Sequence, residues 1–233
     1  MSIKRQLFFV TILTVNVLCR GVCSMARSKI KVEKGKLADY RARRNFTVTT
    51  EPSGEEQKKI GKEPIFVIQK HDARTLHYDF RLEIDGVLKS WAIPKGPSLN
   101  PSIKRLAVPT EDHPLGYAEF EGVIPEGQYG AGPVMVWDIG TYVNIKRDKK
   151  GKLQPIKKCY KEGRIEVYLE GEKLYGDFAL IRTSRTTKGK HNWLLIKMKD
   201  EYASTSRNPV ARRTKSAITN RTLTQIKKDA KTK

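Results

Sequence analysis

The fold class follows from one segment, Leu76-His77-Tyr78-Asp79-Phe80-Arg81-Leu82-Glu83-Ile84, which continues through Asp85-Gly86 into Val87-Leu88-Lys89-Ser90-Trp91-Ala92-Ile93. Polar and apolar residues alternate along its first half, as they do in a β-strand that buries one face. Asp85-Gly86 is typical of a two-residue hairpin turn, because glycine, and aspartate tolerably, accepts a positive φ angle. The segment therefore predicts a pair of antiparallel strands.

Further short apolar or alternating runs suggest more strands of the same kind. They cover residues 66–68, 106–108, 134–137, 165–169, 178–181 and 193–196. No helical pattern recurs between them, which disfavours a parallel sheet built from βαβ units. The sequence therefore predicts a mainly β fold, a compact antiparallel β-barrel with short helices and basic terminal extensions.

Composition narrows the class of partner. The 233 residues include 46 lysines and arginines against 25 aspartates and glutamates, a formal net charge of +21. Such a charge attracts acidic partners, nucleic acid first among them. A hydrophobic content of 38% excludes a chain that is disordered throughout. The three cysteines, Cys19, Cys23 and Cys159, form neither a disulfide framework nor a four-cysteine zinc site, which fits a reducing compartment.

The chain divides by composition into four parts. Residues 1–24 form a hydrophobic leader, in which Lys4 and Arg5 precede an apolar run over 7–18. This run is shorter than the roughly 20 residues of a membrane span, so the leader is either a signal peptide or misannotated sequence before a true start at Met25. We expect a basic arm with a short helix over 25–61, the barrel over 62–202, and a disordered basic tail over 203–233.

Functional side chains gather on one face of the first strand. A period of two places His77, Asp79 and Arg81 together, opposite apolar residues that supply a core. His71 lies just upstream as a third candidate ligand. Two imidazoles and one carboxylate suit manganese, iron or zinc, and Arg81 suits an anion, so we expect them in the barrel interior or a cleft. The competing interpretation is an exposed polar face with an Asp79–Arg81 salt bridge. Residues 111–117, which contain His113, add an acid, a base and a phenol.

Several motifs together resemble a known family. They are residues 66–71, 76–83, 88–98, 111–115, 120–122, 124–127 and 129–132. In these segments the chain closely resembles the 3′-phosphoesterase domain of bacterial ligase D, from about Tyr40 to about Tyr202. The remaining residues hold no polymerase or ligase module, so the chain resembles a free-standing member.

The resemblance implies a β-barrel hydrolase that depends on manganese. It removes a 3′-terminal ribonucleotide as a phosphodiesterase and then the 3′-phosphate as a phosphomonoesterase, leaving a 3′-hydroxyl. By the family pattern, His71, His77 and Asp79 hold the metal. The phosphate contacts are Arg81, His113 and Tyr117, with Lys95 and Arg105 as further phosphate positions. Positions implicated in the two hydrolytic steps are Arg44, Glu51, Gln69 and Glu111. The family usually has aspartate where this chain has Asn45, which puts the diesterase step in question.

The resemblance also implies a setting. The substrates are DNA or DNA/RNA 3′ ends at primer-templates in non-homologous end joining, with a repair ligase or end-binding protein as possible partners. We expect a monomer in the cytoplasm with no membrane association, or an exported protein if the leader is a signal peptide. His113 either donates to a phosphoryl oxygen or protonates the leaving alkoxide, and the sequence leaves both roles open.

Two rival functions are consistent with parts of the sequence. The pair His77-x-Asp79 with a later histidine is also the facial triad of a non-haem iron oxygenase, and Arg182-Thr183-Ser184 resembles a co-substrate clamp. That clamp lies too far beyond His113 for the usual order. Charge alone also predicts a non-enzymatic DNA-binding repair accessory protein. Against this, every predicted metal or phosphate position carries a chemically competent residue.

Overall fold

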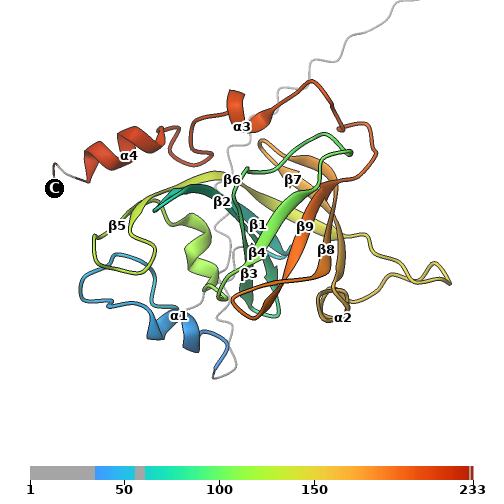
Figure 1. Cartoon of the computed structure of the whole chain (residues 1–233), viewed down its shortest axis with the longest axis horizontal. Coiled ribbons are helices and arrows are strands. Elements are labelled where there is room, and N and C mark those ends of the chain that lie inside the picture. The colour runs from blue at the N-terminus through green and yellow to red at the C-terminus, as the bar shows by residue number, and fades with distance from the viewer. Residues whose placement is uncertain (1–34, 56–60, 231, 233) are drawn as a thin grey trace, which may run out of the picture.

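Eight strands form a closed antiparallel barrel (Figure 1). The computed structural model describes residues 35–55, 61–230 and 232. In order around the barrel the strands are β1 (Ile65–Asp72), β2 (Leu76–Ile84), β3 (Val87–Ile93), β4 (Arg105–Pro109), β9 (Lys190–Lys197), β8 (Tyr175–Thr187), β7 (Arg164–Gly171) and β6 (Gly132–Asn144). Pairing of β1 with β6 closes the ring, and β5 (Gly122–Ile124) extends the sheet beside the start of β6. The predicted barrel is confirmed.

The predicted hairpin is also confirmed. Ile84 of β2 pairs with Val87 of β3, which leaves a two-residue turn. Asp85 and Gly86 have φ angles of 59° and 80°, as a type I′ turn requires. This turn fixes the register of the whole strand pair and sets Arg81 opposite Ser90.

The interior of the barrel is filled by apolar side chains. Tyr78, Phe80 and Leu82 of β2 join a buried cluster to which every strand of the barrel contributes. An eight-stranded barrel is just wide enough for its side chains to fill it, so the polar face of β2 has to point outward. Of the two places expected for the site, the cleft is correct and the barrel interior is wrong.

A second apolar cluster covers the outer face of β1, β3 and β6. It includes Tyr40 of α1 (Ala38–Ala42) and Tyr117 of the 3₁₀-helix η1 (Leu115–Glu119). The expected short helix in the basic arm is therefore present, and its fully buried Tyr40 donates a hydrogen bond to the carbonyl of Pro52 (2.7 Å). The arm and η1 convert an open sheet face into a walled cleft.

The expectation of a disordered tail is wrong for residues 203–230, which run across one end of the barrel (Figure 1). They include α3 (Pro209–Arg212) and α4 (Leu223–Asp229), and Ile226 of α4 is 2% exposed. Trp137 Nε1 donates to the carbonyl of Arg213 (2.5 Å). Scattered apolar residues anchor this basic segment. Thr222 and Gln225 form a capping box at the start of α4, a helix signal in the sequence that a prediction based on charge alone does not use.

The remaining features add little to the site. Helix α2 (Ile156–Glu162) was not predicted, and it carries the buried Cys159. Within the ranges that the structure describes, no helix is long and apolar enough to cross a bilayer. The predicted leader over 1–24, with Cys19 and Cys23, lies outside the described residues.

Candidate active site

A pocket of about 740 Å³ opens on the outer face of β2. Strands β1 and β2, the segment from Thr110 to Tyr117, and the loop between β5 and β6 supply its walls. The predicted site residues that line it are Arg44, His71, His77, Asp79, Arg81, Glu111, His113 and Tyr117. Residues that are distant in sequence therefore meet in one cavity.

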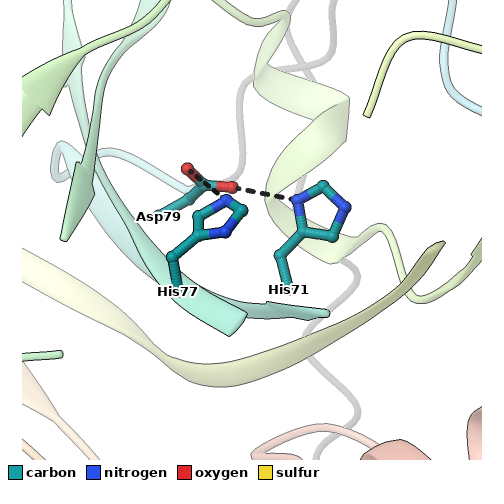
Figure 2. Close-up of side chains that lie close together, drawn as sticks. All are labelled: His71, His77 and Asp79. Atoms are coloured by element: carbon teal, nitrogen blue, oxygen red, sulfur yellow. Dashed lines mark ion pairs between the residues drawn. The ribbon is translucent and has the colours of Figure 1, made fainter. Parts of the chain in front are cut away.

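Three candidate metal ligands face one another at one end of the pocket (Figure 2). The register of β1 and β2 pairs His71 with His77, and Asp79 follows two residues along β2. Asp79 Oδ2 lies 3.6 Å from His71 Nδ1, and Asp79 Oδ1 lies 3.7 Å from His77 Nε2. The candidate ligand atoms all lie within 4.8 Å of one another.

Backbone carbonyls orient both imidazoles. His71 Nε2 donates to the carbonyl of Gly130 (2.7 Å), and His77 Nδ1 donates to the carbonyl of Thr75 (2.8 Å). The opposite ring nitrogens, His71 Nδ1 and His77 Nε2, then face Asp79. This is how metal-binding histidines are commonly held, so the donor set fits a divalent transition metal.

The loop between β5 and β6 approaches β1 closely enough to supply one of these carbonyls. Gly132 has φ 135°, and a side chain there would collide with the backbone of Asp72. Glycine is therefore required at this close approach, which brings the carbonyl of Gly130 to His71. The glycine-rich segment is the turn between β5 and β6, and it also orients a candidate ligand.

The charged groups around the three candidate metal ligands stabilise one another. Burial opposes ionisation of Asp79, but Arg81 and the two histidines outweigh it and hold the pKa of this carboxyl well below its usual value. Burial likewise opposes the charge of His77, but the hydrogen bond and charge of Asp79 raise the pKa of this imidazole overall. The carboxylate is therefore ionised at neutral pH.

Arg81 connects the candidate metal ligands to the rest of the pocket. Its side chain is buried, with 3% of the residue exposed. Its Nε donates to Gln69 Oε1 (2.8 Å) and its Nη2 donates to Asp79 Oδ2 (3.1 Å). Its Nη1 lies 2.8 Å from both Ser90 Oγ and His113 Nδ1. These contacts use four of the five N–H groups of a guanidinium. The Asp79–Arg81 salt bridge of the competing interpretation exists, but it is buried in the pocket and not on an exposed face.

His113 lies between two arginines. Its Nδ1 contacts Arg81, and its Nε2 lies 3.4 Å from Arg44 Nη2. Burial, followed by the charges of Arg81 and Arg44, holds the pKa of this imidazole well below its usual value. His113 is therefore neutral at neutral pH in the free protein.

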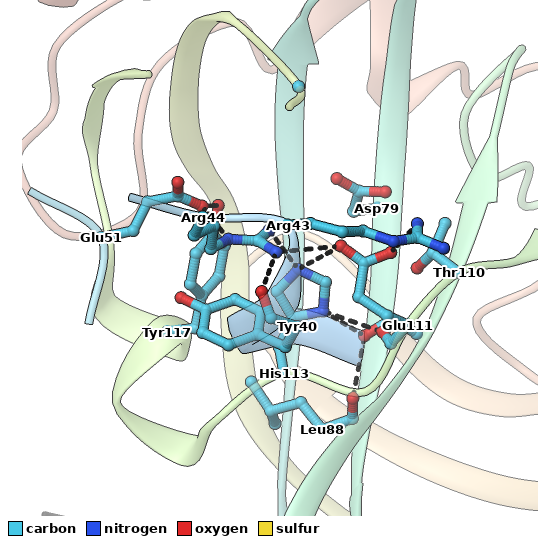
Figure 3. Close-up of polar contacts among 12 residues, drawn as sticks. Tyr40, Arg43, Arg44, Glu51, Asp79, Leu88, Thr110, Glu111, His113 and Tyr117 are labelled. Carbon is cyan, nitrogen blue, oxygen red and sulfur yellow. Dashed lines mark hydrogen bonds and ion pairs between the residues drawn. The ribbon is translucent and has the colours of Figure 1, made fainter. Parts of the chain in front are cut away.

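A second polar network joins Arg44, Glu51, Glu111 and Tyr117 (Figure 3). Arg44 donates from Nε to Glu51 Oε1 (2.9 Å) and from Nη1 to Glu111 Oε1 (3.2 Å). Tyr117 Oη donates to the same Glu51 oxygen (2.9 Å). Burial, reinforced by the charge of Glu51, raises the pKa of Tyr117 well above its usual value, so the phenol keeps its proton.

Gln69 is fully buried behind the pocket. Its Oε1 accepts the hydrogen bond from Arg81, while its Nε2 donates to the carbonyls of Tyr117 (2.9 Å) and Phe120 (3.0 Å). It therefore fixes Arg81 and η1 relative to β1 without lining the pocket itself.

Two predicted phosphate residues do not line this pocket. Lys95 is exposed in the turn after β3. Arg105 is half-buried in β4, and its Nε has no hydrogen-bond partner in the described part of the chain. Sequence reasoning missed Ser90, although the hairpin register sets it opposite Arg81. It also missed the pocket residues Arg74 and Lys188, which no motif marks.

Comparison with known proteins shows which family and which proteins this chain is similar to. The family model for the DNA ligase D 3′-phosphoesterase domain matches residues 69–182. The chain is 48% identical over 191 residues to the multifunctional non-homologous end joining protein LigD of Pseudomonas aeruginosa, covering 80% of this chain and 22% of that protein. It is 48% identical over 166 residues to the LigD protein of Mycolicibacterium smegmatis, covering 71% and 21%. The chain thus spans about a fifth of the length of these curated relatives.

Proposed function

Since the chain belongs to the DNA ligase D 3′-phosphoesterase domain family, we propose that it is a metal-dependent hydrolase that heals DNA 3′ ends. Its two proposed activities are removal of a 3′-terminal ribonucleotide and removal of a 3′-phosphate, which together leave a 3′-hydroxyl. The relatives are named for non-homologous end joining, and we propose the same repair setting for this chain.

One observation carries the proposal: the three candidate metal ligands and three of the predicted phosphate contacts, Arg81, His113 and Tyr117, line the same pocket. His71, His77 and Asp79 would hold the ion, which we propose to be manganese. A bound divalent ion lowers the pKa of a water ligand and neutralises charge on a phosphate. A phosphoester hydrolase needs this chemistry beside fixed cationic donors, and Arg81 lies directly next to Asp79.

The protein side chains have separate proposed roles. Arg81 and Arg44 bind the phosphoryl oxygens through charge-assisted hydrogen bonds. The low pKa of His113 favours a neutral imidazole that donates its N–H to a phosphoryl oxygen, over an imidazolium acid already charged in the free protein. Tyr117 keeps its proton and offers a neutral donor once phosphate competes with Glu51.

Three further residues act by positioning. Glu51 and Glu111 hold Arg44 between them, and Gln69 holds Arg81. Their loss should therefore misplace the cations without removing them. Lys95 and Arg105 remain proposed contacts for substrate outside the pocket.

Substrate, partners and location are proposals of the same kind. We propose primer-template 3′ ends of DNA or mixed DNA and RNA as substrates, with a repair ligase or end-binding protein as a partner. The proposed protein is a monomer that works in the cytoplasm, where end joining takes place.

The test is end conversion by purified protein. A labelled primer-template that ends in a 3′-ribonucleotide or a 3′-phosphate is incubated with manganese or with chelator. Conversion of both ends only with manganese is the expected result. Asp79→Asn should abolish conversion, whereas Asp229→Asn, which changes an exposed carboxylate of α4, should not. Tight binding with no conversion by the unmodified protein would instead favour an accessory DNA-binding protein.

A further inference from the structure

The pocket carries two cations that the proposed chemistry does not use. Arg74 and Lys188 both line it, and both side chains are exposed. Neither forms a hydrogen bond or ion pair with any residue in the described ranges. Arg44 and Arg81, by contrast, are already paired with carboxylates. Arg74 and Lys188 are therefore available to an anion that comes from outside.

The two cations come from two different hairpin turns. Arg74 lies in the turn between β1 and β2, three residues from each candidate histidine ligand. Lys188 lies in the turn between β8 and β9, with φ 48°. Positive φ is uncommon for a lysine and fits the tight hairpin there.

Hydrogen bonds connect the second hairpin to the Arg81 position of the β2 face. Lys190 Nζ donates to the carbonyl of Thr110 (3.3 Å), and the amide of Thr110 donates to the carbonyl of Ser90 (3.0 Å). Ser90 is paired with Arg81. The turn with Arg74 thus adjoins His77, and the turn with Lys188 adjoins the Arg81 end of the pocket.

Between these ends, the backbone of β2 is longer than the spacing of two phosphates. The backbone positions of His77 and Arg81 are four residues apart along β2, about 13 Å at 3.3 Å per residue, and both side chains reach Asp79 between them. One strand of DNA carries a phosphate about every 3.4 Å along the helix axis. A strand whose terminal phosphate lies between these ends therefore presents neighbouring phosphates to the rim of the pocket.

We propose that Arg74 and Lys188 form a backbone clamp, which binds phosphodiester groups adjoining the terminal one on the strand that enters the pocket. This proposal rests on the proposed function, which identifies the strand as the one that carries the 3′ end. Its ligand is the sugar–phosphate backbone and not the bases, so it holds the strand without regard to sequence. It also gives the site a preference for a polymer over a mononucleotide.

The first test is the salt dependence of binding without metal. Fluorescence anisotropy of a 3′-phosphorylated primer-template gives Kd over a series of KCl concentrations. Each lost phosphate contact reduces the slope of log Kd against log salt by about 0.9. Arg74→Ala and Lys188→Ala should each show this reduction, and the double variant about twice as much. The matched control is Lys150→Ala, in the loop between β6 and α2 that extends away from the barrel (Figure 1). Slopes equal to that of the control in all variants would overturn the clamp.

The second test separates the clamp from the proposed reaction. Turnover of the 3′-phosphorylated oligonucleotide is compared with turnover of thymidine 3′-monophosphate, which lacks neighbouring phosphates. The double variant should lower the ratio of the two kcat/KM values about tenfold, since two charge-assisted contacts are lost. An unchanged ratio would overturn the clamp. If the unmodified protein turned over neither substrate, the proposed reaction would fail while the salt slopes still decided the clamp.

Discussion

Gln69→Leu tests whether the pocket depends on a buried residue that does not line it. The change preserves volume but removes three hydrogen bonds, one from Arg81 and two to the carbonyls of Tyr117 and Phe120. Leaving a buried charged donor unpaired costs about 1.5 kcal/mol or more, and each buried carbonyl about 1 kcal/mol or more. The free energy of unfolding should therefore fall by at least about 3 kcal/mol.

Urea unfolding followed by tryptophan fluorescence measures this loss. With a slope of about 2 kcal/mol per molar urea, the midpoint should fall by about 1.5 M. Gln69→Glu separates the two halves of the contact, because a carboxylate still accepts from Arg81 but cannot donate to the two carbonyls. The control Gln154→Leu changes a half-buried glutamine whose side chain contacts Cys159 Sγ at 3.8 Å, and should move the midpoint little. A wild-type midpoint in Gln69→Leu would refute the view that this residue joins Arg81 to η1.

Three other changes test separate parts of the structure. Asn45→Asp should preserve the two hydrogen bonds that Asn45 Oδ1 accepts from Thr47. In the end-conversion assay it should raise the rate of ribonucleotide removal relative to phosphate removal about tenfold or more, and an unchanged ratio would show that a carboxylate at this position is not limiting. Ile226→Ala should lower the free energy of unfolding by about 2 to 4 kcal/mol, whereas Ile218→Ala, at an exposed position, should have little effect in the same urea titration. Burial raises the pKa of Asp138 in β6 to about 6, so its stabilising contribution is complete below about pH 4 and is lost as the pH rises through 6. The free energy of unfolding should therefore fall by up to about 3 kcal/mol between pH 4 and pH 7.5, and Asp138→Asn should remove this pH dependence.

Local sequence predicted the hairpin and the residues that share its faces. A two-residue turn at Asp85-Gly86 fixes all pairs between β2 and β3, so the contact of Arg81 with Ser90 follows from the turn alone. The alternation along β2 likewise separates the core residues from the site residues. These predictions succeed because each depends on neighbours within about 20 residues.

The walls of the pocket depend on longer connections. Arg44 reaches Glu111 across 67 positions, and the β8–β9 hairpin reaches Thr110 across 80. No turn or period encodes such contacts. Lys188 therefore could not be assigned to the pocket from the sequence, and Arg44 was predicted as a site residue only from the family resemblance. The carboxy-terminal segment was missed for a related reason, since Ile226 acquires its role only when it meets the barrel.

The position of the cleft follows from the barrel itself. Because an eight-stranded barrel buries one face of every strand, a strand that carries His77, Asp79 and Arg81 has to present them outside. An outer face is ordinarily open to water, which screens charges and weakens a cationic phosphate site. The arm with Tyr40 and the η1 segment with Tyr117 exclude water from that face, leaving Asp79 and Arg81 5% and 3% exposed. The peripheral segments, and not the barrel, thus give this face the low solvent exposure that the proposed binding of phosphate by charged donors requires.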